Sequence, residues 1–144
     1  CKQIDGSVLW LFTPYQVFSI DDPITKKTIA QVESSLVYDR GVKRYLNDVY
    51  YGGGKWIILT CWLGLYYVKT NQFEKARAQL NWCTEHAEAN GLFPEQILED
   101  LNYPEFKTEW EEKWWPDSPS PLLWSHSMFL ILYYRLKEKE GNKS

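Results

Sequence analysis

The order of hydrophobic and polar residues along the chain predicts helices and no convincing pair of β-strands. Between residues 73 and 88, apolar side chains recur every three or four positions and polar side chains fill the other face, which predicts an amphipathic helix. We expect Asn71 to cap this helix and Gly91 to be the left-handed residue past its end. Its apolar positions are Phe73, Ala76, Leu80, Cys83 and Ala87.

A second amphipathic helix is predicted between Asp22 and Tyr38, with Pro23 in its first turn. Residues 56–68 and 122–136 are different, because they are apolar on nearly every side, and such helices have to be surrounded by protein. Residues 8–12 are predicted to be the end of another buried helix. The apolar stripe of the helix after Asp22 consists of Ile24, Ile29, Val32 and Leu36.

Buried and amphipathic helices alternate along the chain, which predicts an all-α fold with an inner and an outer layer of helices. No sequence repeat is found, so a solenoid of helical hairpins is not favoured. Two long connections, residues 39–55 and 91–121, separate the helices. Long connections in a compact domain are usually functional, so we expect these two to line a site.

The composition excludes several classes of protein. A chain of 144 residues suits one domain, and 44% hydrophobic with 24% charged residues is typical of a globular protein rather than a disordered one. The net charge of -3 and the lack of a basic block argue against nucleic acid as a partner. The apolar stretches are shorter than the roughly 20 residues that cross a bilayer, so no membrane partner is expected.

The three cysteines, Cys1, Cys61 and Cys83, are far apart and form no CxxC motif. We expect Cys61 and Cys83 to be buried free thiols, which slightly favours a reducing compartment such as the cytoplasm. His86 lies close to Cys83 but no second pair follows, so neither a metal site nor a cofactor is expected. The chain starts without Met or a signal-peptide pattern, and we expect its true beginning to be missing.

The first connection contains three consecutive glycines, Gly52 to Gly54, but lacks the spacing of a phosphate-binding loop. Its aromatic and charged side chains suit a sugar, because rings pack on the C–H faces of a pyranose while Arg and carboxylate groups bind pairs of hydroxyls. A packed, tyrosine-rich turn with an ordinary ion pair explains the same residues. These residues are Arg44, Tyr45, Asp48, Tyr50, Tyr51 and Trp56.

The second connection places Glu95 and Gln96 after a proline, and Glu95 taken alone is most simply a surface residue. Three tryptophans and several acids between residues 109 and 115 form either part of a site or an exposed flap. His126 has no serine and acid at the spacing of a hydrolase triad, so we expect it to be hydrogen-bonded and half-buried.

Three segments, in this order, resemble the carboxy-terminal part of glucoamylase-like glycoside hydrolases of family fifteen. They are Arg44 to Trp56, with its aspartate, tyrosines and triple glycine, then Pro94-Glu95-Gln96, then residues 120–126 with Trp-Ser-His at their end. Together they cover about the last hundred residues. The link between residues 99 and 117 looks longer and richer in Trp and acids than is usual in the family.

This resemblance implies an incomplete (α/α)6 barrel, in which residues 1–144 are the C-terminal portion of one catalytic domain and its N-terminal portion is the missing partner. It implies exo-acting, inverting release of glucose from non-reducing ends of α-glucosides, of the starch, maltooligosaccharide or isomaltose type. Glu95 would be the general base, and the general acid would precede this chain. Substrate-binding residues implied by the resemblance are Arg44, Asp48, Tyr50, Trp56, Gln96 and Trp124, with Gln96 also helping to orient Glu95.

Two other functions remain open at this point. An (α/α)6 disaccharide phosphorylase would use phosphate in place of water and would need no general base. A non-enzymatic helical scaffold would instead bind protein or peptide through the aromatic loops. If the glycosidase interpretation holds, we expect the isolated 144-residue chain to be inactive, because the acid and half of the pocket would be absent.

Overall fold

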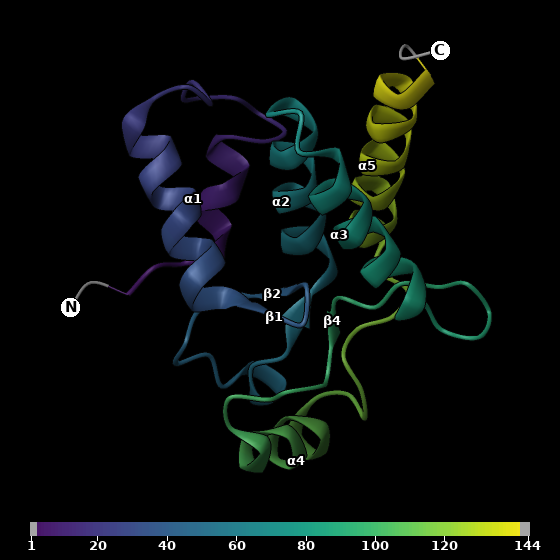
Figure 1. Ribbon diagram of the computed structural model, residues 1–144. Helices are drawn as coiled ribbons and strands as arrows, with labels where there is room; N and C mark the ends of the chain where they lie inside the picture. Colours follow the sequence, from purple (N-terminus) through teal and green to yellow (C-terminus); the bar gives the residue numbers. More distant parts are fainter. Residues whose placement is uncertain (1–2, 142–144) are drawn as a thin grey trace.

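The computed structural model describes residues 3–141, so Cys1 and the last three residues lie outside the described residues. It is mostly helical, with a small sheet at one end of the helices (Figure 1). The helices are α1 (Pro23–Leu36), α2 (Ile57–Lys69), α3 (Phe73–Glu85), α4 (Pro104–Lys113) and α5 (Leu123–Gly141), with two 3₁₀ turns, η1 (Gly6–Leu11) and η2 (Tyr50–Gly52).

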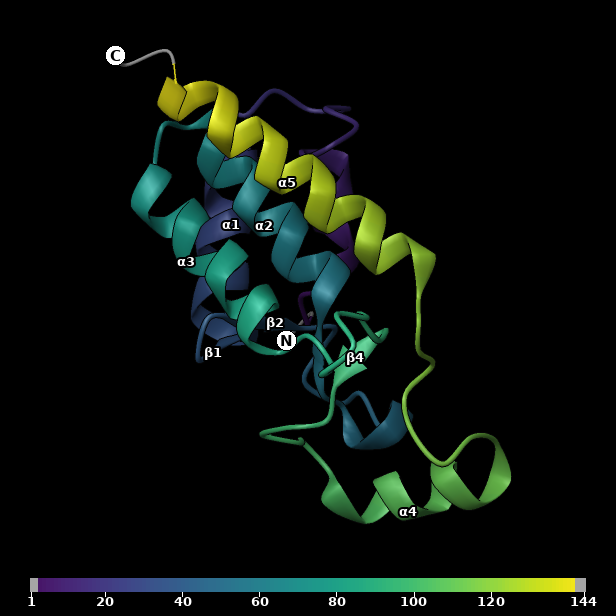
Figure 2. The same cartoon turned by 90° about the vertical axis from the view of Figure 1, so that its right-hand side faces the viewer.

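Helix α2 is the centre of the core, as its all-round apolar sequence predicts. Every residue from Ile57 to Val68 is buried. Helices α3 and α5 pack along it, and η1 contacts it as well (Figures 1 and 2). Gly64 allows the close approach of α5, because a Cβ there would lie 2.7 Å from Leu132 Cδ2. The buried helix is therefore confirmed.

The outer helices follow the predicted pattern with two differences. In α1, Ile29, Val32 and Leu36 are buried as expected, but Ile24 in the first turn is 74% exposed, since it projects beyond the end of the packed stripe. In α3 the helix begins one residue after Gln72, and Asn71 takes a left-handed conformation (φ 59°) instead of capping it.

Two further predictions are corrected at helix ends. Gly91 has the expected left-handed conformation (φ 80°), but α3 already ends at Glu85, so the glycine belongs to the following loop. The segment that includes residues 8–11 is a short 3₁₀ turn rather than the end of a longer helix, although Leu9 and Phe12 are buried.

Helix α5 is not surrounded by protein on all sides, contrary to the prediction. Leu132 and Leu136 face the core, because one side of α5 packs against α2 and α3. Its opposite face is apolar and exposed at Leu123, Leu130, Ile131, Tyr133 and Tyr134. None of the helices between residues 3 and 141 is long and apolar enough to cross a membrane.

The expectation of no paired strands is wrong. Four short strands, β1 (Val37–Tyr38), β2 (Gly41–Lys43), β3 (Lys55–Trp56) and β4 (Gln96–Ile97), form an antiparallel sheet in the order β1-β2-β3-β4. Strands of two or three residues are too short to show a recognisable alternation of apolar and polar positions. The sheet joins the two long connections, which the helical pattern alone leaves unrelated.

Candidate functional site

The sheet brings three predicted site residues to neighbouring positions. Arg44 directly follows β2, Trp56 ends β3, and Glu95 directly precedes β4. Trp56 pairs with Gln96 in the ladder, and the N–H of Ile57 donates to the Glu95 carbonyl at 3.4 Å. The N–H of Glu95 donates to the carbonyl of Pro119 at 2.9 Å. The backbone of Glu95 is thus held on both sides.

The carboxyl group of Glu95 is half-buried, and its Oε2 atom is buried without a hydrogen-bond partner in the protein. Burial raises the pKa of Glu95 above its ordinary value. A hydrogen bond with the Tyr50 side chain and the positive charge of Arg44 oppose this rise, while the negative charge of Asp48 adds to it. Among these causes, burial has the largest effect on the pKa of Glu95.

Arg44 and Asp48 form a bidentate ion pair. The guanidinium Nε and Nη2 donate to the two Asp48 oxygens at 2.9 and 2.6 Å, and the backbone N–H of Tyr50 donates to Asp48 Oδ1 at 3.0 Å. The side chain of Asp48 is only 1% exposed, whereas that of Arg44 is 31% exposed. The ion pair that was one interpretation of these residues is therefore present, and Asp48 is not placed to meet a ligand directly.

The rings of Tyr50 and Trp56 border the Arg44 guanidinium. Its carbon Cζ lies 5.4 Å from the ring centroid of Tyr50 and 5.0 Å from that of Trp56, both within cation–π distance. Tyr50 also meets Trp110 of α4, with ring centroids 4.9 Å apart and nearly perpendicular planes. Trp110 was predicted only as part of a cluster, and no sequence spacing shows that α4 folds back onto Tyr50.

Gln96 has its side chain inside the protein. Its Oε1 accepts the Gly54 N–H at 3.0 Å, its Nε2 donates to the Tyr50 carbonyl at 3.2 Å, and its backbone N–H donates to Ser118 Oγ at 3.0 Å. The side chain is fully buried. The Gln96 side chain is therefore not exposed for direct contact with a substrate. The amide instead ties the glycine-rich loop to the strand that follows Glu95.

Trp124 lies at the start of α5, where its half-exposed ring meets Trp62 edge-on at 5.6 Å. Its neighbour Ser125 connects this helix end to the segment of Glu95, because Ser125 Oγ donates to the carbonyl of Pro94 at 2.8 Å. His126 Nε2 accepts the Phe93 N–H at 3.0 Å, which confirms the predicted hydrogen-bonded, half-buried histidine.

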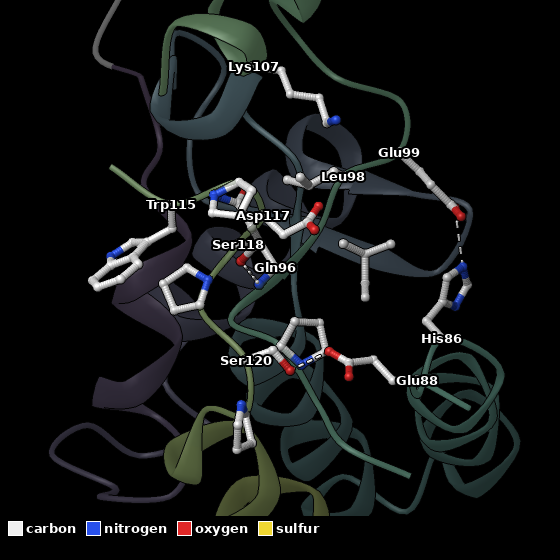
Figure 3. Close-up of a pocket in the computed structure, with 15 residues that line it drawn as sticks. His86, Glu88, Gln96, Leu98, Glu99, Lys107, Trp115, Asp117, Ser118 and Ser120 are labelled. Atoms are coloured by element: carbon white, nitrogen blue, oxygen red, sulfur yellow. Dashed lines mark hydrogen bonds and ion pairs between the residues drawn. The ribbon is translucent and has the colours of Figure 1, made fainter. Parts of the chain in front are cut away.

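Two cavities are found among the described residues. One of about 970 Å³ is lined by Gln96, Ser118 and Lys107 among others (Figure 3). At its rim, His86 Nε2 lies 3.2 Å from the acceptor oxygen Oε2 of Glu99. A second, of about 820 Å³, lies against the exposed face of α5. Glu95 lines neither cavity.

Metal-binding side chains do not gather in the part of the chain that the structure describes: no three His, Cys, Asp or Glu residues between 3 and 141 form such a group. Cys61 and Cys83 are buried free thiols, as predicted, with their sulfur atoms 3.8 Å apart between α2 and α3.

Comparisons with known proteins agree on one class. No family model matches the chain. An isomaltose glucohydrolase of Kribbella flavida is 38% identical over 129 residues, which are 90% of this chain and 33% of that protein. A glycosidase variant in complex with glucose matches with a TM-score of 0.90 and 36% identity, covering 95% of this chain and 37% of that one. A bacterial glucoamylase complexed with acarbose matches with a TM-score of 0.73 and 26% identity over 94% of this chain and 21% of that one.

The helical fold and these relatives place the chain among the glycosidases whose helices form an (α/α) barrel. More particularly, it belongs to the glucoamylase-like glycosidases, which confirms the resemblance carried by its three motifs. The chain spans about a third of the length of the isomaltose glucohydrolase that it matches.

Proposed function

We propose that the protein containing this chain is an exo-acting, inverting glucohydrolase that releases glucose from the non-reducing ends of α-glucosides. The chain supplies the C-terminal portion of its catalytic domain, and the remaining N-terminal portion is its partner. The related proteins support glucosides as ligands, because one is named for isomaltose and two were solved with glucose and acarbose. Isomaltose and maltooligosaccharides are therefore the first substrates to test.

The observation that carries this proposal is the position of the Glu95 carboxyl group. One of its oxygens is buried without a partner, beside the Tyr50 hydroxyl and the Arg44 charge. An inverting glycosidase needs a carboxylate that activates water, roughly 6.5 to 9.5 Å from a protonated acid. The unpartnered oxygen is free to accept a proton from that water. A raised pKa brings the base closer to the pH at which it works, which strengthens general base catalysis.

The neighbouring side chains have complementary roles in this proposal. Arg44 and Tyr50 bind the terminal glucose through the guanidinium edge and the phenol ring. Trp56 is buried, so its indole supports the Arg44 guanidinium rather than contacting the sugar. Asp48 and Gln96 are positioning residues, because Asp48 fixes the guanidinium and Gln96 fixes the loop that carries Tyr50. Trp124 borders the next sugar. The general acid comes from outside this chain.

The test uses the full-length protein with isomaltose and maltose. Wild-type protein is expected to release β-glucose first, detected by proton NMR of the anomeric signals, and the rate should not depend on inorganic phosphate. Glu95→Gln should lower kcat by about 10² to 10⁴-fold, the usual contribution of general base catalysis.

Glu74→Gln is the matched control, because this carboxylate is 90% exposed on α3 and should leave kcat unchanged. Release of α-glucose would contradict inversion. Full activity of Glu95→Gln in the presence of phosphate would favour a phosphorylase, and no turnover of any glucoside would contradict the enzymatic proposal.

A further inference from the structure

Helix α4 carries an exposed pair of stacked indoles next to the Glu95 site. Trp110 and Trp114 lie one helical turn apart, with ring centroids 6.0 Å apart and planes inclined by 23°. The side chain of Trp110 is half-buried, whereas Trp114 is 63% exposed. Stacked aromatic rings at a surface present a flat apolar face on which the C–H face of a sugar ring can pack.

This indole pair is continuous with the proposed catalytic base. Trp110 meets Tyr50 edge-on with centroids 4.9 Å apart, and Tyr50 is hydrogen-bonded to Glu95. Trp110 is also tilted against Tyr51 at 5.9 Å. Two ring-to-ring steps therefore lead from the residue beside Glu95 to the exposed Trp114.

Helix α4 buries none of its residues completely. It is nevertheless held in place on the glycine loop, the segment Tyr50 to Gly54. At its start, the N–H of Tyr103 donates to the Gly52 carbonyl at 2.9 Å. Just beyond its end, the Tyr51 hydroxyl donates to the Trp115 carbonyl at 3.2 Å. Both ends of α4 are thus fixed to the loop that carries Tyr50, and the helix lies against η2 of that loop (Figure 2).

We propose that Trp110 and Trp114 form a stacking platform for the third glucose unit of the substrate, which is the second one beyond the bond that is cleaved. This inference rests on the proposed function and specifies its substrate as an oligosaccharide longer than a disaccharide. The exposed indole of Trp114 offers its ring to the C–H face of a pyranose. Exposed carboxylates on α4, such as that of Glu112, are available to sugar hydroxyls.

Trp115 provides a matched control within the same loop. Its side chain is as exposed as that of Trp114, at 64%, but it lines the cavity of Figure 3 and stacks on neither Trp110 nor Tyr50 among the described ring contacts. The hydrogen bond that it accepts from Tyr51 uses its backbone carbonyl, so Trp115→Ala retains that bond.

The experiment compares kcat/KM of the full-length protein for a di-, a tri- and a tetrasaccharide of one α-linkage. Trp114→Ala should lower kcat/KM for the longer substrates by about three- to tenfold, the effect of losing one aromatic stacking contact. Its kcat/KM for the disaccharide should stay within twofold of wild type, and Trp115→Ala should match wild type for all three.

Equal effects of Trp114→Ala on all three substrates, or no effect, would overturn the platform while leaving the role of Glu95 intact. A large fall in the thermal unfolding temperature of Trp114→Ala, without a chain-length effect, would also overturn it, since the indole would then pack against protein. If wild-type protein cleaves no glucoside, the proposed function fails. Calorimetric titration with the tetrasaccharide then tests the platform separately: weaker binding by Trp114→Ala supports it, and unchanged binding overturns it.

Discussion

The buried oxygen of Glu95 has a consequence for stability as well as for catalysis. Because the pKa of Glu95 is raised in the folded protein, the folded state binds this proton more tightly than the unfolded state does. The group therefore favours folding below its unfolded pKa, which is about 4.3. That contribution is lost as the pH rises through the folded pKa, and the ionised carboxylate then costs stability at neutral pH.

Replacing Glu95 by Gln should remove this cost. We expect Glu95→Gln to raise the free energy of unfolding relative to wild type at pH 7, and to change it less at pH 4, where more of the wild-type carboxyl groups carry the proton. Urea unfolding of both proteins at the two pH values measures the difference. A Glu95→Gln protein that is less stable than wild type at pH 7 would show that the carboxylate is stabilised by its surroundings, contrary to the direction of its pKa.

At the residue scale, the sequence identifies which side chains gather but not how each is used. Arg44, Glu95 and Tyr50 can be selected from residue type and motif, and the structure brings them together. Asp48 and Gln96 carry the same kinds of polar group, yet both are buried and hydrogen-bonded within the protein. The hydrogen-bond partners of a polar group decide whether it is free for a ligand, and those of the Gln96 amide, Gly54 and Tyr50, are distant in sequence.

At the scale of elements, the glycine loop between η2 and β3 determines where Asp48 and Tyr50 lie. Gly53 has φ +77°, and a Cβ there would lie 2.3 Å from the Asp48 carbonyl oxygen. Gly91 has a similar φ of +80° but nothing within 4 Å of the same position. Substituting each glycine by alanine therefore distinguishes the free-energy cost of a left-handed backbone from the additional cost of a steric clash.

We expect Gly91→Ala to lower the free energy of unfolding by about 1 to 2 kcal/mol, the cost of a left-handed L-residue. Gly53→Ala should cost more than this, because a backbone carbonyl cannot move aside as a side chain can, and it should also lower kcat/KM through Asp48 and Arg44. Denaturant unfolding and kinetics of the two variants test this. Equal losses of stability would show that the loop relaxes around the added methyl group.

The elements also differ in whether the sequence predicts them. Helices α1, α2, α3 and α5 could be recognised because enough apolar residues recur at helical spacing to define a buried face. Helix α4 could not, because it is polar and is held mainly by Trp110 and its terminal hydrogen bonds. The four strands could not be predicted for a different reason. Each strand has only two or three residues, and paired residues can be as distant in sequence as Trp56 and Gln96.

At the scale of the whole molecule, the exposed face of α5 is apolar where a helix of an isolated domain is usually polar. Leu130, Ile131 and Tyr134 line a cavity of about 820 Å³ together with Leu65 and Val68 of α2. The chain spans about a third of the length of its isomaltose glucohydrolase relative, which leaves ample protein to cover this face in the proposed catalytic domain. We expect the rest of the domain to pack there.

A charge placed in that cavity tests this packing in the full-length protein. Ile131→Glu should lower the free energy of unfolding by about 2 to 5 kcal/mol if the remainder of the domain buries the site, because an unpaired carboxylate is then removed from water. Asn81→Glu is the control, since Asn81 is exposed on the polar face of α3, and substitutions at open surface positions usually change stability by less than about 0.5 kcal/mol. Denaturant unfolding of both variants gives the comparison. Equally small effects would mean that the α5 face stays in water, and the remaining portion of the domain would then have to close the ring of helices elsewhere.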